Sequence, residues 1–273
     1  MNVLHSRYGT LVRREFWENR GLWIAPLVAA SLMILGCIVL ALRLAGGGAI
    51  QIEVGGSMRN FADAARGFEI SAAVATALVL GVGGIAALMY AFDSLYAERK
   101  DRSILFWKSL PVSDRETVLS KLAVAVLVLP VGLYLLAVVT HLLGGVILSL
   151  NPPGGVPLHQ MWDPQVVFRT YGQIAWLVFT NILWFLPVFS YALLASVIAT
   201  KSPLLTGALP FLIGAAVERV VFGTSGITRF VLGRLSFVHD AEVYARPGLW
   251  AGLAVAAGIL YIVIRLRRYR DDS

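Results

Sequence analysis

The chain has 273 residues, of which 58% are hydrophobic and only 14% are charged, and its mean hydropathy is +0.76. A soluble protein of this length has too little interior to bury so much apolar surface, so the composition predicts an all-α polytopic membrane protein. The formal net charge of +7 does not indicate nucleic-acid binding, because the basic residues flank apolar runs and do not cluster on a soluble domain.

The residue pattern of 1–21 predicts a basic amphipathic helix that lies on the inner membrane surface. Its apolar face is interrupted by Glu15. The residues of the apolar face are Leu4, Tyr8, Leu11, Val12 and Phe16, and the arginines opposite them are Arg7, Arg13, Arg14 and Arg20.

Six apolar runs are long enough to cross a bilayer of about 30 Å, which makes residues 1–273 a single transmembrane domain. The predicted spans are 22–42, 70–92, 122–150, 171–200, 204–222 and 248–264. Residues 227–238 form a further apolar segment that is too short to cross and is expected to be re-entrant or interfacial. His141 lies inside the third span without an acidic neighbour at helical spacing, which favours a hydrogen-bonded packing role over a functional one.

The segment 93–121 is the most charged part of the chain, and it lies between two of the most apolar parts. A short amphipathic helix is predicted over Asp101–Leu110, because Pro111 cannot continue it and its apolar residues gather mainly on one side. Ser113 and Glu116 form a capping box that begins a second helix, which continues into the third span. A short helix held at the start of the third span is suited to the transfer of force from a soluble partner into the membrane. An interfacial loop with Phe106 and Trp107 in the headgroups is the alternative.

The distribution of basic residues predicts the orientation. Of the 23 Lys and Arg residues, 15 lie in the two terminal segments, in 93–121 and in the turn at Lys201, and eight lie in the other three loops. This bias places both termini and the segment 93–121 in the cytoplasm.

No pattern in the sequence predicts a catalytic, cofactor or metal site. A nucleotide-binding P-loop needs Lys directly after Gly, and none of the four lysines follows a glycine. The four histidines are scattered, no ligand cluster has metal spacing, and no Gly-x-Ser-x-Gly elbow occurs. Isolated carboxylates at the ends of spans are interpreted as groups solvated by water or lipid headgroups.

Two runs of residues flank the predicted short helix, namely Tyr96-Ala97-Glu98-Arg99-Lys100-Asp101 and Ser109-Leu110-Pro111-Val112-Ser113, and a helix that opens with Asp114-Arg115-Glu116 follows them. In these residues the chain resembles the permease subunits of ABC-2 type transporters. Arg13-Arg14-Glu15-Phe16-Trp17 resembles the interfacial connecting helix of the family, and the apolar segment between the fifth and sixth spans is also similar.

The resemblance implies a complex of two six-span permeases with two separate ATPase subunits. In the family, the loop between spans two and three carries a coupling helix that sits against the ATPase, and this role is expected for Asp101–Leu110. The residues expected to contact the ATPase are Asp101, Arg102, Leu105, Phe106, Trp107 and Lys108.

The sequence therefore predicts a permease subunit of an exporter in the bacterial inner membrane, with no enzyme activity and no cofactor of its own. Its expected partners are the ATPase subunit, a second copy or homologue of the permease, and membrane lipid. Two alternatives are a polytopic membrane enzyme that acts on lipid and a non-transporting membrane anchor or sensor for an ATPase.

Overall fold

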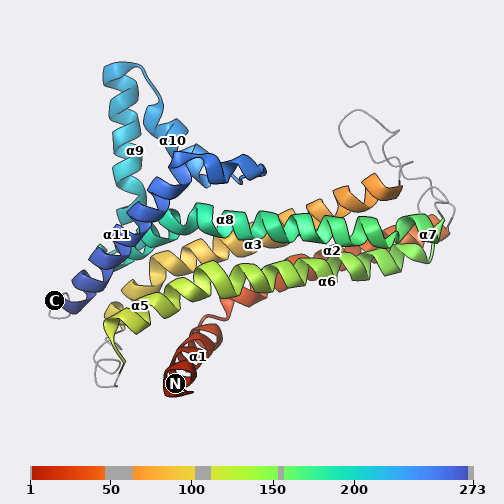
Figure 1. The fold of residues 1–273 in the computed structure, drawn as a ribbon, viewed down its shortest axis with the longest axis horizontal. Coiled ribbons are helices and arrows are strands. Elements are labelled where there is room, and N and C mark those ends of the chain that lie inside the picture. The colour runs from red at the N-terminus through yellow and green to blue at the C-terminus, as the bar shows by residue number, and fades with distance from the viewer. Residues whose placement is uncertain (1, 47–63, 102–111, 153–156, 270–273) are drawn as a thin grey trace. The chain divides into compact units, whose positions relative to one another are not determined.

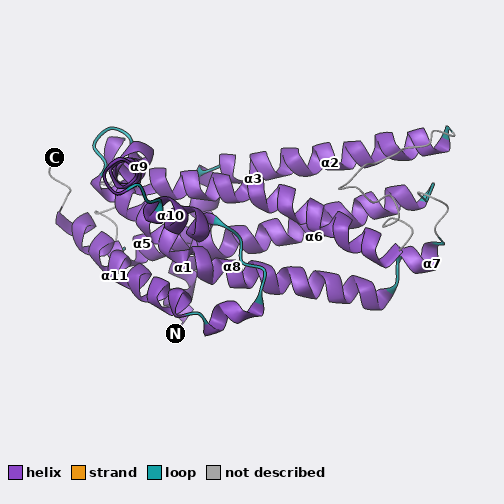
Figure 2. Ribbon diagram, turned by 90° about the horizontal axis from the view of Figure 1, so that it is seen from above, coloured by secondary structure: helices purple, strands orange, loops and turns teal. Residues whose placement is uncertain are grey.

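The computed structural model describes residues 2–46, 64–101, 112–152 and 157–269, and every regular element in these ranges is helical (Figures 1 and 2). Six of the helical segments are long and apolar enough to cross a membrane. The prediction of an all-α polytopic membrane protein is therefore confirmed.

The described part of the chain is a succession of helices. In chain order they are α1 (Asn2–Glu18), α2 (Gly21–Ala45), α3 (Ala64–Lys100), α5 (Asp114–Ala123), the π-helix η2 (Val124–Val128), α6 (Leu129–Ser149), α7 (Leu158–Met161), α8 (Pro164–Ile198), α9 (Pro203–Phe222), α10 (Gly226–Leu235), the 3₁₀-helix η4 (Ala241–Ala245) and α11 (Pro247–Tyr269). The spanning segments are α2, α3, α5 to α6, α7 to α8, α9 and α11.

The chain divides into two compact units. Unit 1 comprises Met1–Leu22, Ile85–Leu129 and Phe179–Ser273, and unit 2 comprises Trp23–Gly84 and Pro130–Val178. Unit 1 therefore contains α1, the second half of α3, α5, the second half of α8, and α9 to α11. All contacts described below lie within one unit.

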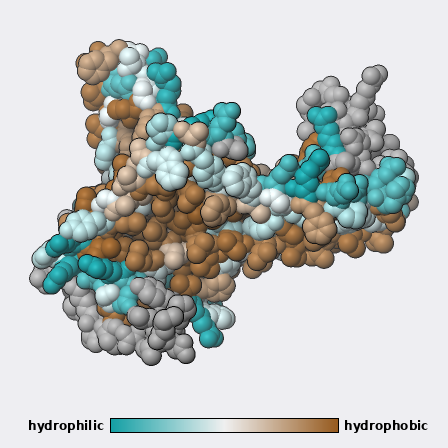
Figure 3. Space-filling view, viewed as in Figure 1, coloured by the Kyte–Doolittle hydropathy of each residue, from teal (hydrophilic) through white to brown (hydrophobic). Residues whose placement is uncertain are grey.

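Large apolar side chains are exposed along the spanning helices, and hydrophobic residues cover much of the surface in Figure 3. Leu42, Phe168 and Val220 are 68%, 79% and 85% exposed. Exposing so many apolar groups to water would be energetically unfavourable, whereas lipid tails are as apolar as these side chains. Such exposed apolar side chains are expected on helices that face lipid.

The capping box predicted at the start of α5 is present. The backbone N–H of Ser113 donates to Glu116 Oε2 at 2.7 Å, and the N–H of Glu116 donates to Ser113 Oγ at 3.3 Å. From this cap, α5 continues through η2 into α6. The widened turns of η2 lie just before Pro130, where the missing N–H and the proline ring do not fit a regular α-helix.

Glycines allow the helices of both units to approach closely. In unit 2, a Cβ at Gly145 would lie 2.8 Å from the Trp162 ring, whose Nε1–H donates to Ser149 at 2.8 Å. In unit 1, a Cβ at Gly207 would lie 2.6 Å from the Phe92 ring, so α9 packs on α3 near its own start. Small residues at such contacts are the usual means of packing helices in membranes.

The helix α10 folds back beside α9, as Figure 1 shows. Gly223 adopts a left-handed conformation with φ of 68°, which ends α9. The Glu218 carboxylate then accepts hydrogen bonds from the backbone N–H groups of Gly226 and Ile227, the latter at 2.7 Å. Because these N–H groups begin α10, the carboxylate both satisfies them and complements the helix dipole.

Arg234 fixes the other end of α10 to α8 and α11. Its guanidinium lies 4.1 Å from the centre of the Trp184 ring and donates to the Gly248 carbonyl at 3.3 Å. A Cβ at Gly252 would collide with this guanidinium, so a larger residue there would require Arg234 to shift. Burial lowers the pKa of Arg234.

Candidate functional site: a buried charge network

The structure places one of the six predicted coupling residues. Asp101 is an exposed turn residue directly after α3. The other five, Arg102, Leu105, Phe106, Trp107 and Lys108, lie outside the described residues, so the coupling helix stays a prediction. The structure does describe the elements from which this segment leaves and to which it returns, namely the end of α3 and the start of α5.

Four buried charged side chains meet between α3 and α5. They are Glu15 of α1, Glu98 of α3, Lys121 of α5 and Arg267 of α11, and they are 2%, 6%, 3% and 5% exposed. Charged residues are almost never buried to this extent unless they are paired. All four belong to unit 1, and we refer to them as the charge network.

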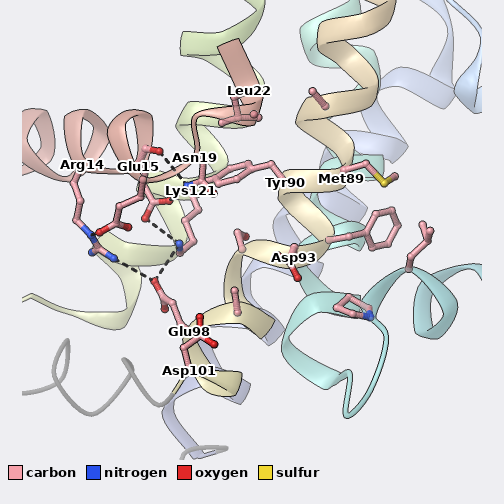
Figure 4. Close-up of a pocket in the computed structure, with 18 of the residues that line it drawn as sticks. Arg14, Glu15, Asn19, Leu22, Met89, Tyr90, Asp93, Glu98, Asp101 and Lys121 are labelled. Atoms are coloured by element: carbon pink, nitrogen blue, oxygen red, sulfur yellow. Dashed lines mark hydrogen bonds and ion pairs between the residues drawn. The ribbon is translucent and has the colours of Figure 1, made fainter. Parts of the chain in front are cut away.

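Lys121 and Glu98 are the central members of the charge network. Lys121 Nζ donates to Glu15 Oε1 at 2.9 Å and lies 3.1 Å from Glu98 Oε1. The second oxygen of Glu98 accepts a hydrogen bond from Arg267 Nη2 at 3.0 Å. The chain of contacts therefore runs through α1, α5, α3 and α11 in turn, and Figure 4 shows its first three members.

Three further side chains border the charge network. The Tyr90 hydroxyl donates to Glu15 Oε2 at 2.7 Å, Arg14 Nη2 lies 3.9 Å from Glu98 Oε1, and Arg267 Nε lies 3.7 Å from Asp114 Oδ1. Burial alone would raise the pKa of Glu15. The positive charge of Lys121, its hydrogen bond, that from Tyr90 and the charge of Arg14 together outweigh it and lower this pKa below its ordinary value of 4.5.

We expect Glu15 to make the stability of the folded protein depend on pH in the acidic range. Because its pKa is lowered on folding, the stability that its ionised form contributes is complete above pH 4.5 and is lost as the pH falls through the folded-state value. The difference in thermal midpoint between the wild type and Glu15→Gln, measured in detergent from about pH 7 to about pH 3, should therefore shrink below pH 4.5. Glu18→Gln is the control, since Glu18 is exposed. A difference that stays constant with pH would contradict the expectation.

The other matched residues at the end of α3 also make defined contacts. Arg99 Nη2 donates to the carbonyls of Ser196 and Ala199 at 2.8 and 2.9 Å, and so satisfies carbonyls at the end of α8. The Tyr96 hydroxyl donates to the Lys201 carbonyl at 2.8 Å. The last turns of α3 are thereby fixed to the turn between α8 and α9 as well as to the charge network.

His141 lies in unit 2 and is held by two hydrogen bonds. Its Nε2 is 2.9 Å from Ser71 Oγ, and its Nδ1 is 2.7 Å from the Tyr171 hydroxyl. The Ser71 hydroxyl also lies 3.0 Å from the Phe68 carbonyl, one turn earlier on α3. Both ring nitrogens of His141 are therefore satisfied by neighbouring helices, which agrees with a packing role for this residue.

The sequence interpretation of carboxylates at span ends as solvated groups is wrong for Glu98, and Glu15 is also buried and paired. One signal could have found Glu15, because it is an acid on the apolar face of an amphipathic helix. Glu98, Lys121 and Arg267 carry no such signal, since each resembles an ordinary charge at the end of a span. Their partners lie 23 to 169 positions away in the sequence.

A pocket of about 770 Å³ opens beside the charge network in unit 1 (Figure 4). Glu15, Glu98 and Lys121 line one side of it, and Met89 and Asp93 of α3 line another. Among the described residues, no three His, Cys, Asp or Glu side chains are grouped to hold a metal ion. Comparison of the chain with protein-family models and with curated proteins found no match in either case.

Proposed function

We propose that the chain is the membrane-spanning permease subunit of an ABC-2 type exporter and that a separate ATPase subunit drives it. The observation that carries the proposal is the charge network. The family resemblance assigns the ATPase contact to residues 101–110, and the two elements that flank this segment are joined directly by the ion pair between Glu98 and Lys121. A force applied to the segment would therefore act on α3 and α5 together.

The roles of the matched residues support the same proposal. In the motif that resembles the family, Tyr96, Glu98 and Arg99 each bind another element of unit 1. Arg14 and Glu15 belong to the second matching motif; Glu15 is a member of the charge network, and Arg14 borders it. The motif residues thus hold the base of the proposed coupling segment, while the segment itself would present Phe106 and Trp107 to the ATPase.

The proposed location is the bacterial inner membrane, with both termini and the segment 93–121 in the cytoplasm. The excess of Lys and Arg in these regions supports this orientation. An ATPase that hydrolyses cytoplasmic ATP could reach residues 101–110 only in this orientation. The proposed complex also contains a second copy or homologue of the permease.

The function is tested by replacing Phe106 and Trp107 together, once with alanine and once with aspartate. The purified wild type should retain a P-loop ATPase subunit from its own membranes, and the variants should fold normally but lose about tenfold or more of this association and of ATP-driven transport, because interface aromatics are frequent hot spots. Replacing the exposed Phe168 and Trp176 with alanine is the matched control. Full ATPase association and transport in both test variants, or labelling of Lys108 from outside the cell, would contradict the proposal.

A further inference from the structure

The helix α1 has one face toward the protein and one face away from it. The face toward the protein contains the buried residues Leu11 and Glu15, where α1 packs against α5 and η2. A step of two residues turns a helix by about 200°, so the opposite face begins at position 13. We call this opposite side the outer face. Its residues are Arg13, Phe16 and Trp17 of α1 and Arg20 in the turn before α2, and all four are exposed.

The outer face combines aromatic rings with cations. Phe16 and Trp17 are 36% and 62% exposed, and the centres of their rings are 6.2 Å apart in an edge-to-face arrangement. The amphipathic pattern of the sequence predicts one apolar face that contains both Leu11 and Phe16, but the structure buries Leu11 against the protein. The side of α1 that remains for the membrane is therefore basic and aromatic.

The arginines of the outer face are not neutralised by the carboxylates of α1. Both carboxylates are already paired, Glu15 with Lys121 at 2.9 Å and Glu18 with Arg14 at 2.7 Å. The two arginines of the outer face make no ion pair or hydrogen bond within the part of the chain that the structure describes. The outer face therefore carries a surplus of positive charge.

Neither α5 nor the helix dipoles reverse this charge. The two acidic residues of α5 are engaged elsewhere, because Glu116 belongs to the capping box and Asp114 lies 3.7 Å from Arg267. The carbonyl end of α1 and the amino end of α2 meet at Asn19 and Arg20, so their partial charges offset each other. An anionic partner is thus favoured over a neutral or cationic one.

The outer face is also close to the point where the chain enters the membrane. Only Asn19 and Arg20 separate α1 from α2, which is long and apolar enough to span a bilayer. Arg13 precedes Arg20 by seven residues, which is about 10 Å along a helix. Tryptophan and arginine side chains are typical of the ends of spans, where they reach the lipid headgroups.

We infer that the outer face binds anionic phospholipid, with the guanidinium groups of Arg13 and Arg20 on lipid phosphates and the rings of Phe16 and Trp17 among the headgroups. Guanidinium groups can donate two parallel hydrogen bonds to a phosphate, and clustered cations beside a span favour lipids with a net negative charge. A soluble protein is a less favoured occupant, because the outer face begins directly at the membrane surface. The site is independent of the proposed function, which concerns residues 101–110.

The test places a fluorescent probe beside the outer face. Gly9 lies one turn before Arg13, it is exposed, and a Cβ there would meet nothing within 4 Å. The full-length chain with Cys37→Ala and Gly9→Cys is labelled with an environment-sensitive fluorophore and placed in nanodiscs of phosphatidylcholine with increasing phosphatidylglycerol. We expect the emission to shift to the blue as the anionic fraction rises. The shift should fade in about 1 M salt, where the Debye length is about 3 Å.

Substitutions separate the role of charge from that of the rings. Arg13→Gln and Arg20→Gln should each weaken the apparent affinity for phosphatidylglycerol about fivefold, as expected for one cation near an anionic surface. Replacing both arginines with lysine keeps the charge and should retain most of the preference. Trp17→Ala should weaken the contact at every lipid composition. Lys100→Gln is the matched control, since it removes an exposed cation from α3, and it should change the affinity less than about twofold.

Three results would overturn the inference. The first is equal emission in neutral and anionic nanodiscs, and the second is a wild-type response from a folded Arg13→Gln, Arg20→Gln double variant. The third is a blue shift that appears only after an ATPase subunit is added, because the outer face would then belong to a protein partner. If the double variant does not fold, the salt titration of the labelled chain with its arginines intact provides the test, since a shift that persists in high salt excludes an electrostatic lipid contact.

Discussion

Replacing Lys121 with methionine is expected to destabilise the protein by about 3–5 kcal/mol, because it leaves the buried Glu15 carboxylate without its cation and Glu98 with Arg267 alone. Lys121 Nζ is 2.9 Å from Glu15 and 3.1 Å from Glu98, and all three side chains are buried. Methionine fills a similar volume and makes no ion pair. The loss should appear as a lower thermal midpoint and earlier unfolding by SDS in mixed micelles.

The matched control for this prediction is Lys100→Met, which changes an exposed lysine at the end of α3 and should shift stability by no more than about 0.5 kcal/mol. The double variant Lys121→Met with Glu15→Met removes the cation together with one of the carboxylates. It should be less destabilised than the sum of the two single variants, because charges in contact are not additive. Equal midpoints for Lys121→Met and Lys100→Met would contradict the role given to the charge network.

The six spans and the start of α5 could be predicted because their signals are local in the sequence. Long apolar runs identify spanning helices, and Ser113 with Glu116 three residues later identifies a helix start. The end of α3 could not be located in this way. The predicted second span stops at residue 92, where charges begin, but α3 continues to Lys100.

The reason for this extension is that several charges in the last turns of α3 find partners on other elements. Glu98 pairs with Lys121 and Arg267, and Arg99 binds the end of α8. Whether a charge near a span is solvated or paired depends on which elements meet in space, and residues 15, 98, 121 and 267 are too far apart in the chain for spacing to show this. The pocket was missed for the same reason, since its walls come from five separate elements.

Replacing Glu98 with glutamine should reduce transport per ATP hydrolysed, by about tenfold, while the ATPase subunit remains bound. The variant keeps the shape of the side chain, but it removes the charge that pairs with Lys121, with Arg267 and, more distantly, with Arg14. Glu98 is a positioning residue in the proposed permease. Without the direct ion pair between α3 and α5, movement of the segment between them would shift that segment alone and would not move both helices. A misplacement of about 1 Å is enough to lower the rate of a step that depends on exact positioning.

The decisive measurement is the ratio of transport to ATP hydrolysis in reconstituted vesicles, together with the amount of ATPase subunit that stays bound. A residue with a purely structural role would lower the yield of folded complex but leave this ratio unchanged. Glu18→Gln is the control, because Glu18 is exposed and the ion pair recorded for it is with Arg14 on the same helix. An unchanged ratio in Glu98→Gln would mean that the charge network holds α3, α5 and α11 together without transmitting the ATPase movement. Coupling would then have to depend on contacts made by residues 102–111 themselves.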